Sequence, residues 1–326
     1  MENEIGSILI LGAAGFVGGY LIKECKKQGY EVYATKLEHE EIHIACDQIY
    51  NLNLLDKENI HDVLHTAKPK SIVNLSAQSS VGLSWKNPQL TIDVNIKGVV
   101  NLLESVKEYD KNTKILLISS SEEYGKQSES ECYITEEHPT NPSNPYAVTK
   151  ACQTMFSKLY NESYDMNIIT MRAFNHIGPG QNMGFVVPDF CQQIVDIEIG
   201  KKAPKIIVGN LSACRDFTDV RDIVKGYLKV LEKGKRNTIY NIGSGKAVSI
   251  ESILKQLLSF SRKTIEIEID SEKFRPNDVK IIEANIDKIR NDTGYQPEIS
   301  LSSTLQETLN YFRKKSEENC EIQNKF

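Results

Sequence analysis

The order of apolar and polar positions divides the first half of the chain into alternating strands and helices. Short runs of consecutive apolar residues are typical of strands that are buried on both faces. Such runs predict strands at 8–11, 30–35, 71–75, 114–118 and 167–171. Stretches with helical periodicity lie between them, at 20–28, 57–66, 94–109 and 146–160. Repeated strand–helix units of this kind predict a parallel sheet covered by helices on both faces.

This alternation breaks after about Arg172, where loops and shorter elements follow. The pattern there predicts two short strands, at 206–208 and 238–242. It predicts helices at 188–200, 219–232, 250–260 and 301–315. The last residues, 316–326, are polar and are expected to fray.

Composition narrows the classes of protein and partner. The 326 residues carry a net charge of -5, which argues against nucleic acid as the main partner. No apolar run approaches the roughly 20 residues that cross a membrane, so no membrane partner is expected. The seven cysteines are scattered and form no C-x-x-C pair, which argues against a metal site. Such thiols, in a chain without an N-terminal signal, predict a cytoplasmic protein.

A glycine-rich turn follows the first predicted strand. The sequence Gly12-Ala13-Ala14-Gly15-Phe16-Val17-Gly18 stands between that strand and a helix. Glycines permit a tight turn and the close approach of a pyrophosphate, to which a helix N-terminus offers N–H groups. The position after a strand and before a helix therefore predicts a dinucleotide site. The alternative is a tight turn without a ligand.

The end of the second predicted strand bears on which dinucleotide binds. An acidic residue there would contact the adenine ribose of NAD. The sequence Tyr33-Ala34-Thr35-Lys36 has no carboxylate, and Lys36 is suited to pair with a 2′-phosphate, with Thr35 as a further hydrogen-bond donor. These residues favour NADP(H). NAD(H) stays open, because the acidic stretch 38–41 follows closely.

Tyr146 and Lys150 form the most suggestive pair for catalysis. They are four residues apart in a predicted helix, so they share one face. An ammonium beside a phenol lowers the phenol pKa from roughly 10, which suits proton transfer in carbonyl reduction or alcohol oxidation. The serine cluster Ser119-Ser120-Ser121 follows a predicted strand upstream. The alternative is a surface tyrosine and lysine at an ordinary helical spacing.

Together, Gly-x-x-Gly-Phe-x-Gly, the serine cluster and Tyr-x-x-x-Lys resemble the extended short-chain dehydrogenase/reductases that act on nucleotide sugars. This resemblance covers nearly the whole chain. It implies an α/β fold, a Rossmann-type doubly wound parallel sheet with a smaller C-terminal α/β substrate domain. The implied NAD(P)-binding domain is 1–173 plus about 216–245, and the substrate domain is about 174–215 and 246–326. A homodimer through the helices at 94–109 and 146–160 is also implied.

The resemblance assigns roles to particular residues. Ser120, Tyr146 and Lys150 match the catalytic triad, and Glu122 aligns with a glutamate that dehydratases of the family use as acid and base. No metal is implied, since the phenol and the serine supply the electrophilic assistance. The residues implied to contact the cofactor are Gly12, Gly15, Phe16, Val17, Gly18, Lys36, Asn53, Leu54, Leu75, Ala77, Tyr146 and Lys150.

Segments of the second half of the chain narrow the range of expected substrates. The stretches 173–181, 184–190, 208–211 and 215–222 resemble the subfamily of GDP-4-keto-6-deoxy-D-mannose reductases. The sister dehydratases continue Phe-Asn-His with Glu-Ser-Pro-Arg-Arg, whereas this chain has Ile-Gly-Pro-Gly-Gln at 177–181. The resemblance implies a GDP-linked sugar that is reduced at C4 to GDP-D-rhamnose. The residues expected to contact it are Ser79, Asn175, Val187, Arg215 and Arg275.

Several alternatives stay open. Glu122 is compatible with a 4,6-dehydratase or an epimerase, as well as with a role in substrate binding. A GDP-linked keto-heptose differs from a 6-deoxyhexose at positions that few side chains decide. Arg215 is open to a structural salt bridge with Asp216 or Asp219. A nucleotide-sensing protein on the same fold would tend to lack the tyrosine or the lysine, and both are present here.

Overall fold

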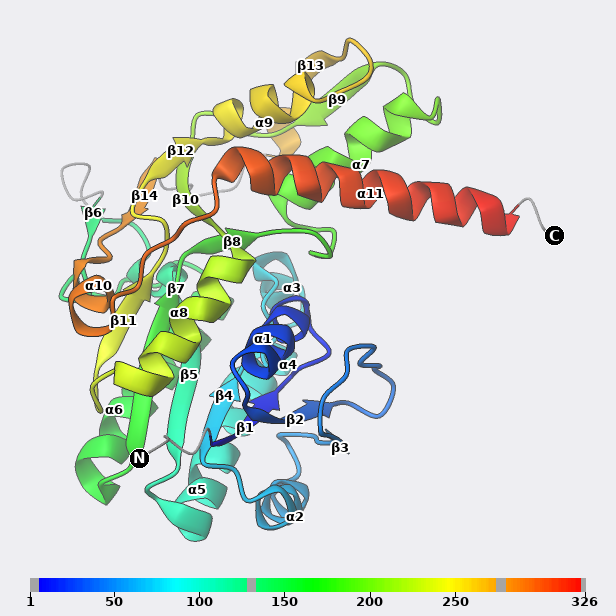
Figure 1. Cartoon of the computed structure of the whole chain (residues 1–326). Coiled ribbons are helices and arrows are strands. Elements are labelled where there is room, and N and C mark those ends of the chain that lie inside the picture. The colour runs from blue at the N-terminus through cyan, green and yellow to red at the C-terminus, as the bar shows by residue number, and fades with distance from the viewer. Residues whose placement is uncertain (1–5, 128–132, 274–279, 324–326) are drawn as a thin grey trace.

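The computed structural model describes residues 6–127, 133–273 and 280–323. It shows a lower part built on one large sheet and an upper part built on smaller sheets (Figure 1). The large sheet has the strand order β11-β7-β5-β4-β1-β2-β3, and its pairings are parallel. Its strands are β1 (Ser7–Leu11), β2 (Glu31–Lys36), β3 (Gln48–Asn51), β4 (Ser71–Asn74), β5 (Lys114–Ser120), β7 (Asn167–Ala173) and β11 (Ile239–Ile242).

Helices cover both faces of the large sheet (Figure 1). In β1, Ile8 and Ile10 belong to one hydrophobic core, whereas Leu9 and Leu11 belong to a second core on the opposite face. Because both faces are buried, the strand reads as a continuous apolar run in the sequence. The helices of this part are α1 (Phe16–Lys27), α2 (Lys57–Ala67), α3 (Val81–Lys86), α4 (Pro88–Ile92), α5 (Gly98–Asp110), α6 (Pro145–Tyr164) and α8 (Val220–Lys233).

The upper part holds shorter strands around a third hydrophobic core. One sheet joins β12 (Ala247–Ser249), β10 (Cys214–Asp219), β14 (Ile281–Ala284) and β6 (Tyr133–Ile134), with β8 (Asn175–Ile177) also paired to β10. A second sheet joins β9 (Lys205–Val208) to β13 (Glu266–Ile269). The helices here are α7 (Val186–Glu198), α9 (Ile250–Ser259) and α11 (Leu301–Gln323), whereas α10 (Asp287–Thr293) packs against α8 and β11 of the lower part.

The topology places a binding site at one point of the large sheet. β1 lies between β2 and β4, so the direction in which the chain winds across the sheet reverses there. Open α/β sheets bind ligands at the carboxyl ends of their strands beside such a reversal. The glycine turn follows β1 at this end, and the upper part lies above it (Figure 1).

The predicted parallel sheet with helices on both faces is confirmed, and each strand predicted in the first half is present. The helix predicted at 94–109 instead consists of a π-helical turn, Asp93–Lys97 (η1), and α5. The chain leaves the large sheet after β7 and returns to it at β11 through α8. The predicted domain boundaries stay a prediction. Among the described residues, no helix is both long and apolar enough to cross a lipid bilayer.

The prediction that the chain frays from Ser316 was wrong, because α11 continues to Gln323. Leu305, Leu309 and Phe312 place one face of α11 in the upper core, against α7. Ser316 continues that face at helical spacing and is only 7% exposed. Packing of one face therefore extends the helix beyond the point where the polar sequence predicted its end.

Candidate active site

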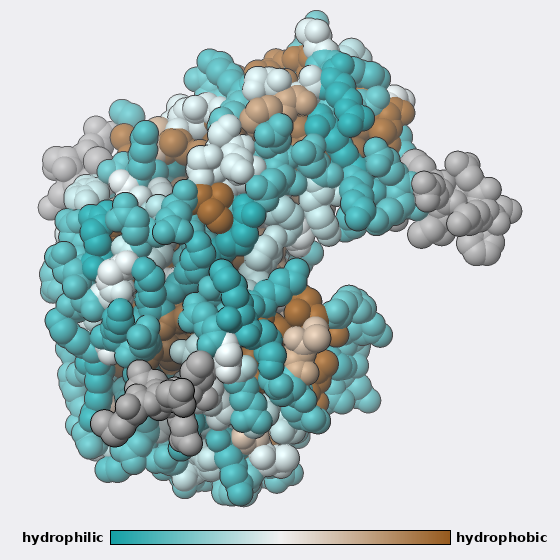
Figure 2. All heavy atoms as spheres, viewed as in Figure 1, coloured by the Kyte–Doolittle hydropathy of each residue, from teal (hydrophilic) through white to brown (hydrophobic). Residues whose placement is uncertain are grey.

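A cavity of about 1540 Å³ lies between the lower and upper parts. The surface is notched between these parts, below α11 (Figure 2). Residues from the carboxyl ends of β1, β4, β5 and β7 line the cavity from below, and residues from α7, β9 and β10 line it from above. Apart from Arg275, every residue predicted to bind cofactor or substrate lines this one cavity. Arg275 lies outside the described residues.

The glycine turn forms the cavity wall after β1. Gly12 has a φ of +70°, and a Cβ there would come within 2.9 Å of the Ser76 backbone. Gly15 is the N-cap of α1, and the first turn of that helix has no acidic residue. A turn that needs glycine, followed by a helix N-terminus without a carboxylate, fits a pyrophosphate. The residues present therefore suit the dinucleotide that the sequence predicts.

The end of β2 lies beside this turn. The Thr35 hydroxyl accepts a hydrogen bond from the Gly12 amide at 3.2 Å, and Thr35 is buried. Thr35 therefore supports the turn, and the hydrogen bond predicted from its hydroxyl to a 2′-phosphate stays a prediction. The Lys36 ammonium donates to the backbone oxygens of Leu37 and Glu38, at 3.4 and 3.3 Å. Lys36 lines the cavity together with Glu40.

Tyr146 and Lys150 lie one turn apart near the start of α6, and both are buried in the cavity wall. The Asn144 side chain caps this helix, its Oδ1 accepting from the Ala147 amide at 2.8 Å. The Lys150 ammonium donates to the Ile118 backbone oxygen at 2.7 Å. It lies 5.9 Å from the centre of the Tyr146 ring.

The charges around this pair differ from the sequence-based expectation. Burial raises the pKa of Tyr146 above its usual range, and a hydrogen bond with Ser120 opposes that rise. Burial lowers the pKa of Lys150 to about 8, and the nearby Glu123 carboxylate opposes that fall. Burial thus raises the phenol pKa, whereas the sequence predicted that the lysine would lower it. Tyr146 is a neutral phenol near pH 7, which suits a proton donor.

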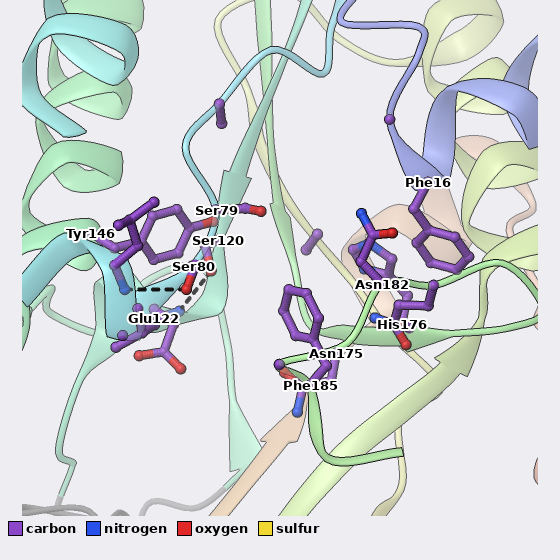
Figure 3. A pocket seen from close by; sticks show the side chains of 18 of the residues that line it. Phe16, Ser79, Ser80, Ser120, Glu122, Tyr146, Asn175, His176, Asn182 and Phe185 are labelled. Carbon is purple, nitrogen blue, oxygen red and sulfur yellow. Dashed lines mark hydrogen bonds between the residues drawn. The ribbon is translucent and has the colours of Figure 1, made fainter. Parts of the chain in front are cut away.

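Ser120 and Glu122 lie on the same side of the cavity as Tyr146 (Figure 3). Ser120 ends β5, and its hydroxyl accepts from the Glu122 amide at 3.2 Å in the short 3₁₀ turn Ser121–Tyr124 (η2). The Glu122 carboxylate accepts a hydrogen bond from the Asn144 side-chain nitrogen, Nδ2, at 2.9 Å. Asn144 was missed in the sequence, although Asn followed by Pro is a helix N-cap signal.

The opposite side of the cavity carries β8 and the segment that joins it to α7. Asn175 and Phe185 project between the two sides, with Asn182 beside His176 and Phe16 (Figure 3). The His176 ring lies parallel to that of Phe16, at 6.3 Å between centres, and burial lowers the pKa of His176. The Tyr20 hydroxyl donates to the Pro179 backbone oxygen at 2.6 Å. These contacts attach the segment to α1.

The arginine predicted to bind the diphosphate lies on β10. The Arg215 guanidinium donates to the Cys214 backbone oxygen at 2.8 Å and lines the cavity. Asp219 pairs with Arg221 at 2.7 Å. The Asp216 carboxylate accepts from the Ser244 and Gly245 amides. Both carboxylates considered as structural partners of Arg215 thus bind other groups.

Other features of the site concern single residues. Trp85 is 64% exposed and lines the cavity, so it does not fill the core. Val187 is buried and Ser79 exposed, and each lines the cavity. The Asn53 side-chain oxygen accepts from the Leu55 amide at 3.0 Å. Within the described parts of the chain, no group of three or more His, Cys, Asp or Glu side chains is arranged to hold a metal.

Comparison with known proteins agrees with this geometry. The family described as GDP-mannose 4,6 dehydratase matches residues 9–308. The GDP-6-deoxy-D-mannose reductase of Pseudomonas aeruginosa is 28% identical over 302 residues, covering 93% of this chain and 95% of that protein. The UDP-glucuronate 4-epimerase of Thermodesulfobacterium geofontis is 29% identical over 332 residues, covering 98% of each.

One solved structure bears on the cofactor. It is described as RMD from Pseudomonas aeruginosa complexed with NADPH, and it is 27% identical to this chain. Its TM-score is 0.85, with 95% of this chain and 99% of that chain covered. Sequence and structure comparison thus agree on the fold of more than nine-tenths of the chain.

Proposed function

The chain belongs to the GDP-mannose 4,6 dehydratase family of NAD(P)-dependent nucleotide-sugar enzymes, and within it we propose that the chain is a reductase. The proposed reaction reduces the C4 keto group of GDP-4-keto-6-deoxy-D-mannose with NADPH and gives GDP-D-rhamnose. The observation that carries this proposal is the position of the Tyr146 phenol in the cavity wall, hydrogen-bonded to Ser120. Reduction of a ketone requires such a proton donor beside the oxygen on which charge develops.

Bound dinucleotide supplies the hydride, and the protein supplies position and a proton. The glycine turn and the first turn of α1 would hold the pyrophosphate, with Gly12, Gly15 and Val17 in the cavity wall. Ser120 donates a hydrogen bond to the C4 carbonyl oxygen, which stabilises charge that develops there. Tyr146 gives its proton to that oxygen. Lys150, held by the Ile118 backbone oxygen, presents positive charge beside the phenol.

A dehydratase is the second candidate function, because Glu122 is present in the cavity. Its carboxylate lines the cavity on the Tyr146 side, where an acid and base would act. Two observations favour the reductase: the Glu122 carboxylate is hydrogen-bonded to the Asn144 cap of α6, and the segment 177–181 lacks the two arginines of the sister group. A reductase of a GDP-keto-heptose would use the same residues and differ in the sugar. An epimerase would differ in the reaction, because it regenerates its cofactor in each turnover.

An absorbance assay tests the proposed function. The purified protein is mixed with NADPH and GDP-4-keto-6-deoxy-D-mannose, and loss of the reduced-nicotinamide band is followed. We expect stoichiometric NADPH consumption and a product whose mass and NMR spectrum are those of GDP-D-rhamnose. Elimination of water from GDP-mannose without net NADPH consumption would instead identify a dehydratase.

The proposed preference for NADPH is tested at Lys36. Loss of a charge-assisted contact to a 2′-phosphate costs about 1.5 kcal/mol, so Lys36→Ala should weaken NADPH binding roughly tenfold and leave NADH binding nearly unchanged. Titration of each reduced dinucleotide by fluorescence measures both constants. Lys86→Ala, at another lysine that lines the cavity, is the control and should preserve the ratio. An unchanged ratio in Lys36→Ala would refute the preference.

We also propose a homodimer through the outer face of α6. Val148, Met155 and Leu159 recur at helical spacing on that face and are exposed, Met155 to 71%. Met155→Glu should convert the dimer to monomer, because a charge cannot be buried unpaired in an apolar interface. Light scattering coupled to size-exclusion chromatography measures the mass. Met183→Glu, at an exposed methionine on the segment before α7, should stay dimeric; a dimeric Met155→Glu would exclude this interface.

A further inference from the structure

A buried carboxylate lies directly behind the wall that carries the catalytic residues. Glu123 follows Glu122 in the turn after β5, yet its side chain is fully buried, at 0% exposure, and does not line the cavity. A buried carboxylate is costly to desolvate unless cations or hydrogen-bond donors surround it. Its partners therefore show what it stabilises.

The Glu123 carboxylate contacts three elements of the active site. One oxygen accepts from the Thr154 hydroxyl at 2.8 Å and from the Ser119 hydroxyl. The other oxygen accepts from the Arg172 guanidinium at 3.0 Å. Each donor comes from a different element, β5 for Ser119, α6 for Thr154 and β7 for Arg172.

These donors are close in sequence to the residues that face the cavity. Ser119 precedes Ser120, and its hydroxyl oxygen lies 3.3 Å from the Lys150 backbone oxygen. Thr154 lies one turn beyond Lys150 on the same face of α6. Arg172 precedes Ala173, which lines the cavity. One carboxylate thus fixes the serine, the tyrosine–lysine helix and the floor of the cavity relative to one another.

The Arg172 guanidinium is itself held by groups farther from the cavity. Arg172 lies 4.6 Å from the centre of the buried Tyr124 ring and donates to the Glu136 backbone oxygen at 3.4 Å. The Tyr124 hydroxyl donates to Asn241 at 2.7 Å. Because each buried polar group here has a partner, the pair is rigid, and this rigidity is what orientation of catalytic groups requires.

Glu123 also acts on the catalytic residues through its charge. Its carboxylate raises the pKa of Lys150, opposing burial, and raises the pKa of Tyr146 as well. Burial raises the pKa of Glu123, whereas Arg172 and the two hydroxyls favour its ionised form. Glu123 acts on Lys150 directly, and the Lys150 ammonium lies 5.9 Å from the centre of the Tyr146 ring. Glu122 and Tyr227 interact with Tyr146, and Arg172 pairs with Glu123.

We infer that Glu123 and Arg172 are a buried positioning pair, which aligns β5, α6 and β7 behind the active site and whose carboxylate stabilises the positive charge of Lys150. The inference rests on the proposed function, in which Lys150 supplies charge beside Tyr146. It assigns to Glu123 a role distinct from that of Glu122, since only Glu122 reaches the cavity.

The variant Glu123→Gln tests the inference. The neutral amide removes the charge that opposes the fall of the Lys150 pKa, so Lys150 becomes neutral at a lower pH than in the wild type. As the pH is raised from mildly acidic to alkaline, NADPH affinity, measured by fluorescence, should therefore begin to fall at a lower pH in the variant than in the wild type. Turnover with the keto-sugar should fall on the order of tenfold to a hundredfold, as expected for misplaced catalytic groups.

A matched control separates positioning from general stability. Glu198 pairs with Arg313 at 2.7 Å, is largely buried, and lies outside the cavity lining. Glu198→Gln should lower the melting temperature but leave the pH dependence of NADPH affinity unchanged. If Glu198→Gln moves that dependence as much as Glu123→Gln does, the inference is overturned.

A second variant keeps the test valid if Glu123→Gln does not fold. The double variant Glu123→Gln/Arg172→Gln leaves no unpaired buried guanidinium. Its NADPH affinity should still begin to fall at a lower pH than that of the wild type. A double variant whose pH dependence overlays that of the wild type would overturn the inference. NADPH binding needs no sugar, so this readout stands even if the keto-sugar assay shows that the proposed substrate is wrong.

Discussion

Tyr146→Phe should abolish turnover while the protein still binds NADPH with nearly wild-type affinity. Removal of the hydroxyl takes away the proton donor that lies beside Ser120, while the ring remains in the cavity wall. A general acid contributes roughly a hundredfold to ten-thousandfold to a rate, so a loss in that range is expected. Steady-state turnover and fluorescence titration of NADPH measure the two effects separately.

A second tyrosine on the same helix provides the control. The Tyr160 hydroxyl donates to Glu104 at 2.6 Å, and Tyr160 does not line the cavity. Tyr160→Phe should therefore cost some stability and leave turnover within about twofold of the wild type, as substitutions remote from the chemistry usually do. If Tyr146→Phe keeps full turnover, another group gives the proton, and the assigned role of Tyr146 is wrong.

Gly18→Ala should eliminate dinucleotide binding and destabilise the fold. A Cβ at Gly18 would stand 2.2 Å from the Ala13 backbone oxygen, a distance too short for a non-bonded carbon and oxygen. The glycine turn and the start of α1 must then move apart, which displaces the N–H groups from the pyrophosphate. The expected loss is on the order of 2 kcal/mol of unfolding free energy. Thermal denaturation and NADPH titration check both effects.

The adjacent glycine is a matched control for this substitution. A Cβ at Gly19 would meet only the end of the Ile44 side chain, at 2.7 Å, and that methyl group can rotate away. Alanine is also preferred over glycine inside a helix by about 1 kcal/mol, which offsets the crowding. Gly19→Ala should therefore bind NADPH normally. Equal losses in Gly18→Ala and Gly19→Ala would mean that backbone contact at the turn is not the cause.

The parallel sheet and the cavity were predictable because both depend on local sequence signals. A strand buried on both faces must be apolar throughout, and 8–11 meets this condition. A turn such as that at Gly12 needs φ > 0 and no Cβ, so glycine marks it in the sequence. Helical spacing alone placed Tyr146 and Lys150 on one face.

Tertiary contacts decided what the sequence did not predict. Asn95 lies in the π-helical turn at the start of the helix predicted at 94–109, and its buried side chain accepts from the Gln78 backbone amide and donates to Thr149, at 2.8 and 3.0 Å. The strands of the upper part pair with partners far away in sequence, as β10 does with β14. The rise in the Tyr146 pKa comes from burial, a quantity that a spacing of four residues does not reveal.

The hydrogen bond from Gly12 to Thr35 has a consequence for anyone who redesigns the cofactor preference. Exchange of the residues at the end of β2 is the obvious way to convert an enzyme of this kind from one dinucleotide to the other. Here, one of those residues also supports the glycine turn. An exchange confined to Lys36 would alter recognition alone, whereas one that includes Thr35 would disturb the anchorage that both dinucleotides share. A change at Lys36 can therefore alter the preference between dinucleotides without weakening the binding of both, whereas a change at Thr35 cannot.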